Sequence, residues 1–303
     1  MMRRIMVMRL GALGDFVLSF SAFAAIRAHH ADDQITLLTT APFEALAAAS
    51  PWFDRVEVDS RPGWTDWRGL WRLRRQLAGF DFVYDLQTSG RSSRYFWLAG
   101  RPQWSGIARG CSHPDGDPGR NFLHTLARQT GQLAAAGVAP RKPDLDWLRG
   151  GGPHVAGPYA VVVPGTSASQ GGAKRWPGEL FAGLAVALAA MGLRPVIVGT
   201  KAEAVEAGKI VAACPSALDL TGRTSLLELA GLAARARVAV GGDTGPVHLA
   251  AMMGCRVVAL FSQFSDPALA APVGRTKVIR AGRLEDVALP DVIASVRELL
   301  AEA

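Results

Sequence analysis

The chain of 303 residues has few cysteines and no long apolar run, and both absences limit what it can be. Cys111, Cys214 and Cys255 are far apart and odd in number, which argues against a disulfide framework and favours a reducing cytoplasm. No apolar stretch reaches the length of about 18 residues that a membrane span needs, so we expect no spanning helix. In the N-terminal sequence MMRRIMVMRL, Arg9 interrupts the apolar residues and no small-residue cleavage site follows. We interpret this segment as a first strand and not as a signal peptide.

Lysine is also scarce, because only five of the 33 basic residues are lysines. The net charge of +7 is concentrated in residues 1–150, which hold 19 basic and 14 acidic residues, against 14 and 12 in the remainder. This excess indicates either a solvated surface without a binding role or an acidic partner of the first half. No nucleic-acid-binding motif is recognisable and the aromatic residues read as buried, so we expect no nucleic-acid partner.

The succession of apolar runs and amphipathic segments predicts an α/β fold. In the first half, we expect strands at Arg4–Met8, Ile35–Thr39, Val56–Val58 and Phe82–Leu86. We expect helices near Asp15–Ala28, Pro42–Ala49, Asp66–Ala78, Ser92–Ala99 and Asn121–Ala136. Near-continuous apolar strands separated by helices indicate a parallel sheet covered on both faces.

A linker-like stretch, RGGGPHVAGP at Arg149–Pro158, precedes a second series of the same kind. Strands are expected at Tyr159–Val163, Pro195–Val198, Val238–Val240, Val257–Phe261 and Lys277–Arg280. Helices are expected at Glu179–Met191, Ala202–Ala213, Ser225–Ala234, Val247–Met253 and Pro290–Leu300. The sequence thus predicts two doubly wound, Rossmann-like domains, residues 1–150 and 151–303, facing a central cleft where ligands bind at strand carboxyl ends. We leave open that the last helix packs back on the first domain.

Three turns that follow expected strands carry the candidate chemistry. In the first, RLGALGD, Gly11 and Gly14 bracket a tight loop that does not match the dinucleotide-binding pattern GxGxxG. Asp15 follows at a position typical of a helix N-cap. It either caps the helix or is a carboxylate at the cleft that takes a proton from an attacking hydroxyl.

The second turn is PGTSASQGGAKRWP, Pro164–Pro177. The cations of Lys174 and Arg175 stand beside the hydroxyls of Thr166 and Ser167 and beside free backbone N–H groups, which together suit an anion. Pro177 suits the first helical turn. The alternative is an ordinary surface loop with a Lys-Arg pair.

The third turn lies in GGDTGPVHLAAMMG, Gly241–Gly254, where a strand again leads into a helix. The helix dipole favours negative charge there, and Thr244 is placed to cap the helix. Asp243 is better suited to accept a ligand hydroxyl, or to orient its neighbours, than to contact phosphate. His248 is in the first helical turn, where it is either structural or faces the site. The two Gly-rich turns of this half together indicate a nucleotide-diphosphate ligand.

These segments, in this order, resemble the bacterial ADP-heptose:lipopolysaccharide heptosyltransferases, glycosyltransferase family 9. The resemblance covers the LGD-containing start, PGxxxxxKRWP and DTGxxHLAAxxG, and Ser21 stands where the family commonly has proline. It implies a GT-B fold and an inverting, metal-independent transfer of heptose from ADP-heptose to a lipopolysaccharide-core or related lipid-linked saccharide. It implies no cofactor, since the nucleotide sugar is a substrate.

The resemblance also implies a role for individual residues. Asp15 would be the general base, and Lys174 would neutralise the departing diphosphate with help from Thr166 and Ser167. The other donor-binding residues would be Gly14, Arg175, Glu203 (at the ribose), Asp243, Thr244, Gly245 and His248. A non-catalytic nucleotide-binding module and a GT-B transferase for another nucleotide sugar remain as alternatives.

A metal is not expected at this site. The two DxD sequences, Asp115–Asp117 and Asp144–Asp146, do not follow a strand at the cleft, and the six histidines lack ligand spacing. We therefore assign neutralisation of the charge on the leaving diphosphate to Lys174 and to helix N-termini.

Arginines of the first half are the candidate contacts to an acidic acceptor. Arg91, Arg94, Arg109 and Arg120 lie in or near its loops and suit acidic or phosphorylated sugars. In WTDWRGLWRLRRQL, Trp67 and Trp71 share a helical face with Leu70 and Leu77. This face packs in the core beneath a solvated basic face, or the helix contacts anionic lipid, which would put a cytoplasmic monomer on the inner membrane.

Overall fold

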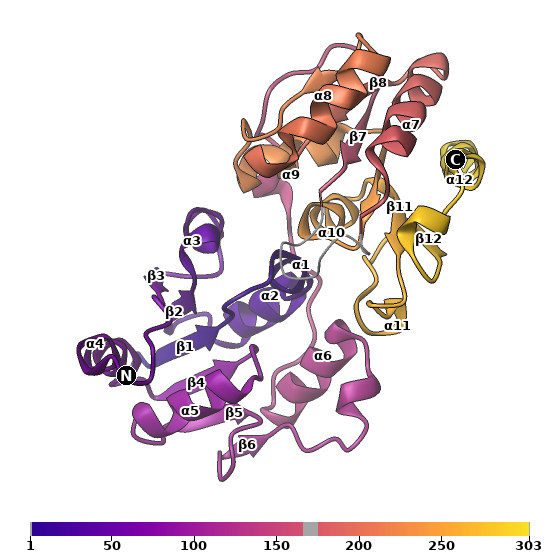
Figure 1. Ribbon diagram of the computed structural model, residues 1–303. Helices are drawn as coiled ribbons and strands as arrows, with labels where there is room; N and C mark the ends of the chain where they lie inside the picture. Colours follow the sequence, from indigo (N-terminus) through magenta and orange to yellow (C-terminus); the bar gives the residue numbers. More distant parts are fainter. Residues whose placement is uncertain (1, 166–174, 303) are drawn as a thin grey trace. The chain divides into compact units, whose positions relative to one another are not determined.

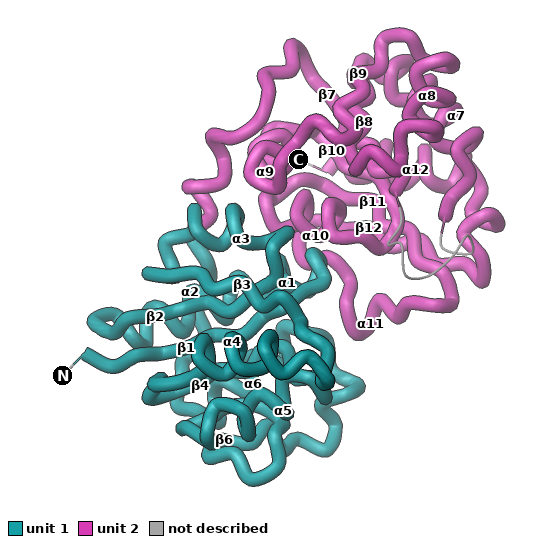
Figure 2. The backbone as a smooth tube through the Cα atoms, turned by 60° about the vertical axis from the view of Figure 1, so that its left-hand side comes forward, with its two compact units in different colours: residues 1–144 teal, residues 145–303 magenta. Residues whose placement is uncertain are grey.

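The computed structural model describes residues 2–165 and 175–302, and the chain divides into two compact units, residues 1–144 and 145–303 (Figures 1 and 2). Each unit is built around one parallel sheet. This confirms the prediction of an α/β protein with two doubly wound sheets.

The sheet of unit 1 has the strand order β3-β2-β1-β4-β5-β6, with every neighbouring pair parallel. Its strands are β1 (Arg4–Met8), β2 (Gln34–Thr39), β3 (Arg55–Val58), β4 (Phe82–Asp85), β5 (Gln103–Gly106) and β6 (His113–Pro114). The first four match the expected strands closely. The last two were not predicted, because QWSG and HP contain no apolar run.

The helices of unit 1 are α1 (Leu13–Leu18), α2 (Phe20–His29), α3 (Ala41–Ala48), α4 (Trp67–Leu77), α5 (Gly90–Leu98) and α6 (Thr125–Ala135). The single helix expected at Asp15–Ala28 is two helices that meet at Ser19. The Ser19 hydroxyl donates to the carbonyl of Asp15 at 2.8 Å, a back-bond of the kind that bends helices.

Helices cover both faces of this sheet (Figure 1). On one face, Leu73 and Leu77 of α4 and Tyr95 of α5 pack with Met6 and Met8 of β1 in one core cluster. On the other face, α6 contacts α1 and α2.

The prediction that Trp67 and Trp71 pack in the core is wrong. They are 70% and 56% exposed, and the buried face of α4 is instead made by Gly69, Leu73 and Leu77. Three small or branched residues at i, i+4 and i+8 are enough to seat the helix on the sheet, so the tryptophans face outward.

Unit 2 repeats this plan with the order β9-β8-β7-β10-β11-β12, again parallel throughout. Its strands are β7 (Tyr159–Val163), β8 (Arg194–Ile197), β9 (Leu218–Asp219), β10 (Val238–Gly242), β11 (Arg256–Phe261) and β12 (Thr276–Arg280). Its helices are α7 (Gly178–Ala190), α8 (Ala204–Ala213), α9 (Leu226–Arg235), α10 (Gly245–Met252), α11 (Pro267–Ala270) and α12 (Leu289–Ala301). The two-residue β9 and the one-turn α11 were not predicted.

The segment that reads as a linker is tied to α9 of unit 2. The guanidinium of Arg235 donates to the carbonyls of Arg149 and Gly151 at 3.0 and 2.9 Å. A Cβ on Gly231 would lie 1.9 Å from the Gly151 oxygen, so glycine at 231 allows this close approach. These contacts explain why the division falls between residues 144 and 145, before the glycines.

The last helix, α12, packs within unit 2. Val292, Val296 and Leu299 are buried in the core cluster that contains β7, β10 and α7 residues. A contact of this helix with the first domain stays a prediction. Within the described ranges, no helix is long and apolar enough to cross a membrane.

Candidate functional site

In each unit the strand order reverses at one place, between β1 and β4 in unit 1 and between β7 and β10 in unit 2. In open parallel sheets, the crevice at the carboxyl ends of such strands is where ligands bind. The three turns singled out in the sequence follow β1, β7 and β10. The strand that precedes each turn is therefore at the switch point of its own sheet.

In unit 1, Asp15 is held by a buried arginine. The side chain of Asp15 is 39% exposed, and its Oδ1 lies 3.1 Å from Nη2 of Arg9, whose side chain is 5% exposed. Arg9 follows β1 directly and donates through Nη1 to the carbonyl of Leu86, the residue after β4, at 2.5 Å. Arg9 thus links the two strands at the switch point and fixes a carboxylate that solvent reaches.

Asp15 is not the N-cap that the sequence suggested. Ala12 has that position, and Asp15 is the third residue of α1, after Leu13 and Gly14. The cap interpretation therefore fails, and the carboxylate is engaged by Arg9 and not by a backbone N–H. Gly14 lies in the first turn of α1, partly buried.

Further cations surround this carboxylate and were not singled out in the sequence. Burial lowers the pKa of Arg9, while Asp15 opposes this shift and Arg128 adds to it. Burial also lowers the pKa of Arg128 on α6, with Arg120 acting in the same direction and Asp15 against it. Three arginines therefore act electrostatically within one neighbourhood of unit 1. Only Arg120 belongs to the residues that the sequence proposed.

Asp85, the last residue of β4, is a second carboxylate beside Arg9 that sequence reasoning missed. It is fully buried, and this burial raises its pKa to about 6. Hydrogen bonds to its side chain and the charge of Arg9 act in the opposite direction and lower the pKa, but burial outweighs them. Its Oδ1 accepts from the N–H groups of Gln87 and Thr88 at 3.1 and 3.0 Å. The clue in the sequence was an acidic residue at the end of an apolar strand.

Replacing Asp85 with asparagine is expected to stabilise the protein at neutral pH. The folded-state pKa is above the ordinary 3.8, so the native state binds more protons and stability falls as pH rises from about 4 to 6. Asparagine keeps the acceptor for both N–H groups without the buried charge. At pH 7.5 the variant should gain on the order of 1–3 kcal/mol, measured by urea unfolding, and the gain should vanish near pH 4.

The matched control is Asp54→Asn. Contacts with Ile35 N–H and Arg27 outweigh burial and lower the pKa of Asp54, so this change should destabilise at pH 7.5. A D85N protein that is less stable than the parent at pH 7.5 would contradict the assignment.

The four arginines proposed for an acidic acceptor lie in different surroundings. Arg91 and Arg94 of α5 both stack on Trp64, at 5.1 and 4.9 Å from the ring centroid. Arg120 is paired with Asp115 through Nε at 2.7 Å, and its buried Nη2 finds no partner among the described residues. Arg109 is exposed in the segment between β5 and β6. The structure therefore joins Arg91 with Arg94 and Arg120 with the Asp15 neighbourhood.

In unit 2, Asp243 and His248 form a pair at the start of α10. His248 is 4% exposed, and its Nε2 lies 3.1 Å from Oδ1 of Asp243. The backbone N–H of Asp243 donates to the carbonyl of Leu260, which fixes the turn against β11. His248 is thus buried in a contact with the Asp243 carboxylate.

Thr244 takes the N-cap position of α10, as expected, but its side chain does not cap the helix. Its hydroxyl donates to the carbonyl of Gly242 at 3.3 Å, and Gly245 is the first helical residue. Gly241 serves packing, because a Cβ there would lie 2.7 Å from Cβ of Val163 on β7.

Glu203 caps the turn after β8. Its Oε2 accepts from the backbone N–H and the hydroxyl of Thr200 at 2.7 and 2.8 Å. A Cβ on Gly165 or Gly199 would lie 3.0 Å from its side chain, so both glycines make room for it. The Glu203 side chain therefore lies next to Gly165, just after the carboxyl end of β7.

Arg175 is paired with Glu206 of α8 at 2.7 Å. The neighbouring Trp176 is buried and donates to the carbonyl of Val287. Pro177 is the N-cap of α7 and not, as expected, part of its first turn. Thr166, Ser167 and Lys174 lie outside the described residues.

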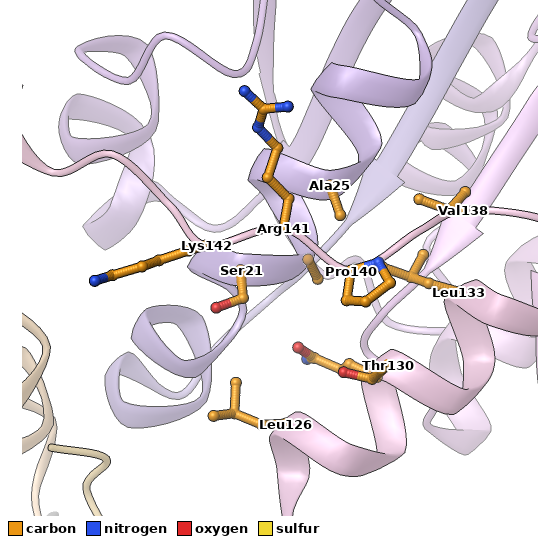
Figure 3. A pocket seen from close by; sticks show the side chains of 11 residues that line it. Ser21, Ala25, Leu126, Thr130, Leu133, Val138, Pro140, Arg141 and Lys142 are labelled. Carbon is orange, nitrogen blue, oxygen red and sulfur yellow. The ribbon is translucent and has the colours of Figure 1, made fainter.

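A separate cavity of about 280 Å³ opens in unit 1 between α2, α6 and the segment that follows α6 (Figure 3). Leu126, Thr130 and Leu133 line it from α6, and Arg141 and Lys142 from the following segment. None of the proposed catalytic or binding residues is in its lining.

Carboxylates, cysteines and histidines do not gather into a possible metal site anywhere in residues 2–165 or 175–302. In the first DxD sequence, Asp115 is engaged by Arg120 and Asp117 accepts from the N–H of Gly119. In the second, Asp146 pairs with Arg149.

Comparison with known proteins identifies the family of this chain. Residues 129–288, more than half of the chain, match the family described as glycosyltransferase family 9 (heptosyltransferase). The chain belongs to glycosyltransferase family 9. A lipooligosaccharide heptosyltransferase 2 of Haemophilus ducreyi is 25% identical over 302 residues, covering 88% of this chain and 85% of that protein.

Two solved structures have the same fold at low sequence identity. The family 9 glycosyltransferase of Veillonella parvula superposes with a TM-score of 0.84 at 21% identity, covering 99% of this chain and 98% of that one. The E. coli heptosyltransferase WaaC with ADP gives 0.80 at 21% identity, covering 98% and 99%. The predicted family and GT-B fold are confirmed, and this member of family 9 is a glycosyltransferase.

Proposed function

We propose that this glycosyltransferase moves a heptosyl group from ADP-heptose to a lipopolysaccharide-core or related lipid-linked saccharide, with inversion and without a metal. One observation carries the proposal. In a family 9 chain, a solvent-accessible carboxylate, Asp15, is held by the buried Arg9 at the switch point of the first sheet. The Haemophilus ducreyi relative is named for lipooligosaccharide, which supports an acceptor of this class.

We assign acceptor activation to unit 1. An acceptor hydroxyl attacks the anomeric carbon of the donor, its proton passes to Asp15, and the bond to the diphosphate breaks on the opposite face of the sugar. Attack from one face and departure from the other give inversion, as in inverting glycoside hydrolysis. Arg9 is a positioning residue, and Arg120 and Arg128 favour an acidic acceptor.

We assign donor binding to unit 2. The N-terminus of α10 presents the positive end of its dipole at Thr244 and Gly245, which suits a diphosphate. Asp243, oriented by His248, accepts a donor hydroxyl, and Glu203 serves the ribose. Lys174, with Thr166 and Ser167, neutralises the leaving diphosphate in place of a metal. The three cysteines at 111, 214 and 255 are free and buried, which supports a reducing compartment, and we propose a monomer working in the cytoplasm.

A panel of nucleotides tests the donor. At about 100 times its dissociation constant, ADP should stabilise the protein by about 2.7 kcal/mol, and UDP and GDP at the same concentration by much less. Thermal unfolding monitored by intrinsic fluorescence measures the difference. A larger shift with UDP or GDP would reassign the donor.

Turnover is measured separately from binding. ADP-heptose and a purified lipopolysaccharide-core acceptor should yield ADP and an acceptor heavier by one heptosyl residue, detected by mass spectrometry. ADP binding without transfer to any such acceptor would instead favour a nucleotide-binding module.

A further inference from the structure

Unit 1 exposes four tryptophans on and beside two neighbouring helices. Trp67 and Trp71 of α4 are 70% and 56% exposed, Trp64 before α4 is 42% exposed, and Trp97 of α5 is 55% exposed. Tryptophan is a large apolar side chain that normally gains by burial, so a group of exposed ones marks an interaction surface.

Each of these indoles lies under an arginine. Arg68 stacks on Trp67, Arg75 on Trp71 and Arg101 on Trp97, with guanidinium carbons 5.1, 4.8 and 5.1 Å from the ring centroids. Trp64 has two such partners, Arg91 and Arg94. We call this set the tryptophan–arginine face: Trp64, Trp67, Arg68, Trp71, Arg72, Arg75, Arg91, Arg94, Trp97 and Arg101.

The two helices that carry the face, α4 and α5, contact each other and pack on the same core cluster, so their outward residues lie on the same side of unit 1. On α4, Trp67, Trp71 and Arg75 recur every four residues, opposite the buried stripe that seats this helix. On α5, Arg94 and Trp97 lie opposite the buried Tyr95 and Phe96. Trp64 bridges the two helices, since its ring contacts Tyr95 and both stacking arginines belong to α5.

The charge of this region is almost entirely positive at its surface. Residues 61–101 contain eight arginines and three aspartates. The aspartates are engaged: Asp66 accepts from the N–H of Gly69 as the cap of α4, Asp81 from the N–H of Arg4, and Asp85 is buried. The partner that complements this face is therefore anionic and has an apolar layer deep enough for an indole.

We propose that the tryptophan–arginine face docks unit 1 on an anionic lipid bilayer. Tryptophan rings settle at the level of lipid headgroups, with the ring partly in the acyl region. Arginine extends an apolar stem through the same layer and leaves its charge among the lipid phosphates. A single-stranded nucleic acid fits less well, because its binding sites are grooves lined by stacking platforms, whereas these rings project from the outer surfaces of two helices.

Vesicle flotation tests the docking with the whole protein. Binding to vesicles of phosphatidylglycerol and phosphatidylethanolamine is expected, with little binding to phosphatidylcholine alone and with release at high salt. Replacing three surface arginines, R68Q/R72Q/R75Q, should weaken binding about 10²-fold, since each contributes roughly fivefold near an anionic surface. W67S/W71S should weaken it at least 10-fold.

The control with the same loss of charge is R237Q/R275Q/R297Q, three exposed arginines of unit 2. The control for lost apolar surface is F264S, at a phenylalanine of unit 2 that is 56% exposed. Both should bind vesicles as the parent does. Circular dichroism and thermal unfolding establish that every variant folds, which is expected for substitutions on an exposed face.

A second measurement does not depend on any variant. Lipids brominated along the acyl chain should quench part of the tryptophan fluorescence of the parent protein, and W67S/W71S should remove much of that quenching. The inference fails if the parent does not bind the anionic vesicles, or if the unit 2 controls lose as much binding as the face variants. It also fails if the face variants lose salt-sensitive RNA binding while vesicle binding is unchanged.

Discussion

Asp15→Asn should lower kcat by about 10²–10⁴-fold while the dissociation constant for the donor stays within a factor of about two or three. Asparagine has the size of aspartate and keeps an oxygen for Nη2 of Arg9, which lies 3.1 Å from Oδ1 of Asp15 in the parent protein. It cannot take the proton of the acceptor hydroxyl. The loss therefore falls on the chemical step, and release of ADP under saturating donor and acceptor measures it.

The control for this change is another aspartate of unit 1 in an arginine ion pair. Asp54 lies 2.6 Å from Nη2 of Arg27 and is 47% exposed, close to the 39% of Asp15. Asp54→Asn should keep its turnover, because nothing in the proposed mechanism uses that carboxylate. If Asp15→Asn turned over like the parent, the base would have to be sought elsewhere, with Asp85 as the next carboxylate beside Arg9.

The sheets were predictable because their strands carry a strong local signal. The strand expected at Arg4–Met8 and the one expected at Tyr159–Val163 have the bounds found in the structure. A parallel strand covered on both faces is a continuous apolar run, which needs no knowledge of its neighbours. The turns after β1, β7 and β10 were found for the same reason, since each lies between such a run and a helix.

Contacts between distant segments could not be read in this way. The spacing of Arg9 and Asp15 in the sequence does not indicate that they pair. The place of Asp85 beside Arg9 depends on β4 lying next to β1, and the hydrogen bond from Arg9 to Leu86 joins residues that are 77 positions apart. Asp15 was placed at the N-cap because the sequence shows only that a helix begins nearby, and cap positions shift by a residue or two. The order of the strands in the sheet decides these contacts, and the hydrophobic periodicity of the sequence carries no information on that order.

The error at α4 has a different cause. A helical projection shows that Trp67 and Trp71 share a side with Leu70, but not which side meets the sheet. In the structure, Gly69, Leu73 and Leu77 make the buried side of the helix. Gly69 leaves no room for a side chain beside Pro62 and the Asp66 carboxylate, and the tryptophans on the opposite side are exposed.

Lys174→Ala should lower kcat by about 10²–10³-fold, the usual cost of removing one group that stabilises developing negative charge. The expected loss follows from the chemistry of the departing diphosphate and from the place of Lys174 in the sequence, in the segment between β7 and α7. Its neighbour Arg175 is held by Glu206 at 2.7 Å, so Arg175→Ala should cost less than about tenfold. Stopped assays of ADP release at saturating donor compare the two variants.

The matched lysine control is Lys209→Ala on α8. Its ammonium lies 2.8 Å from Glu179 and its side chain is 50% exposed, so it removes a unit 2 lysine without touching the proposed donor site. Its turnover should equal that of the parent. An equal or larger loss for Arg175→Ala than for Lys174→Ala would transfer the role to Arg175, whose ion pair with Glu206 would then have to open when the donor binds.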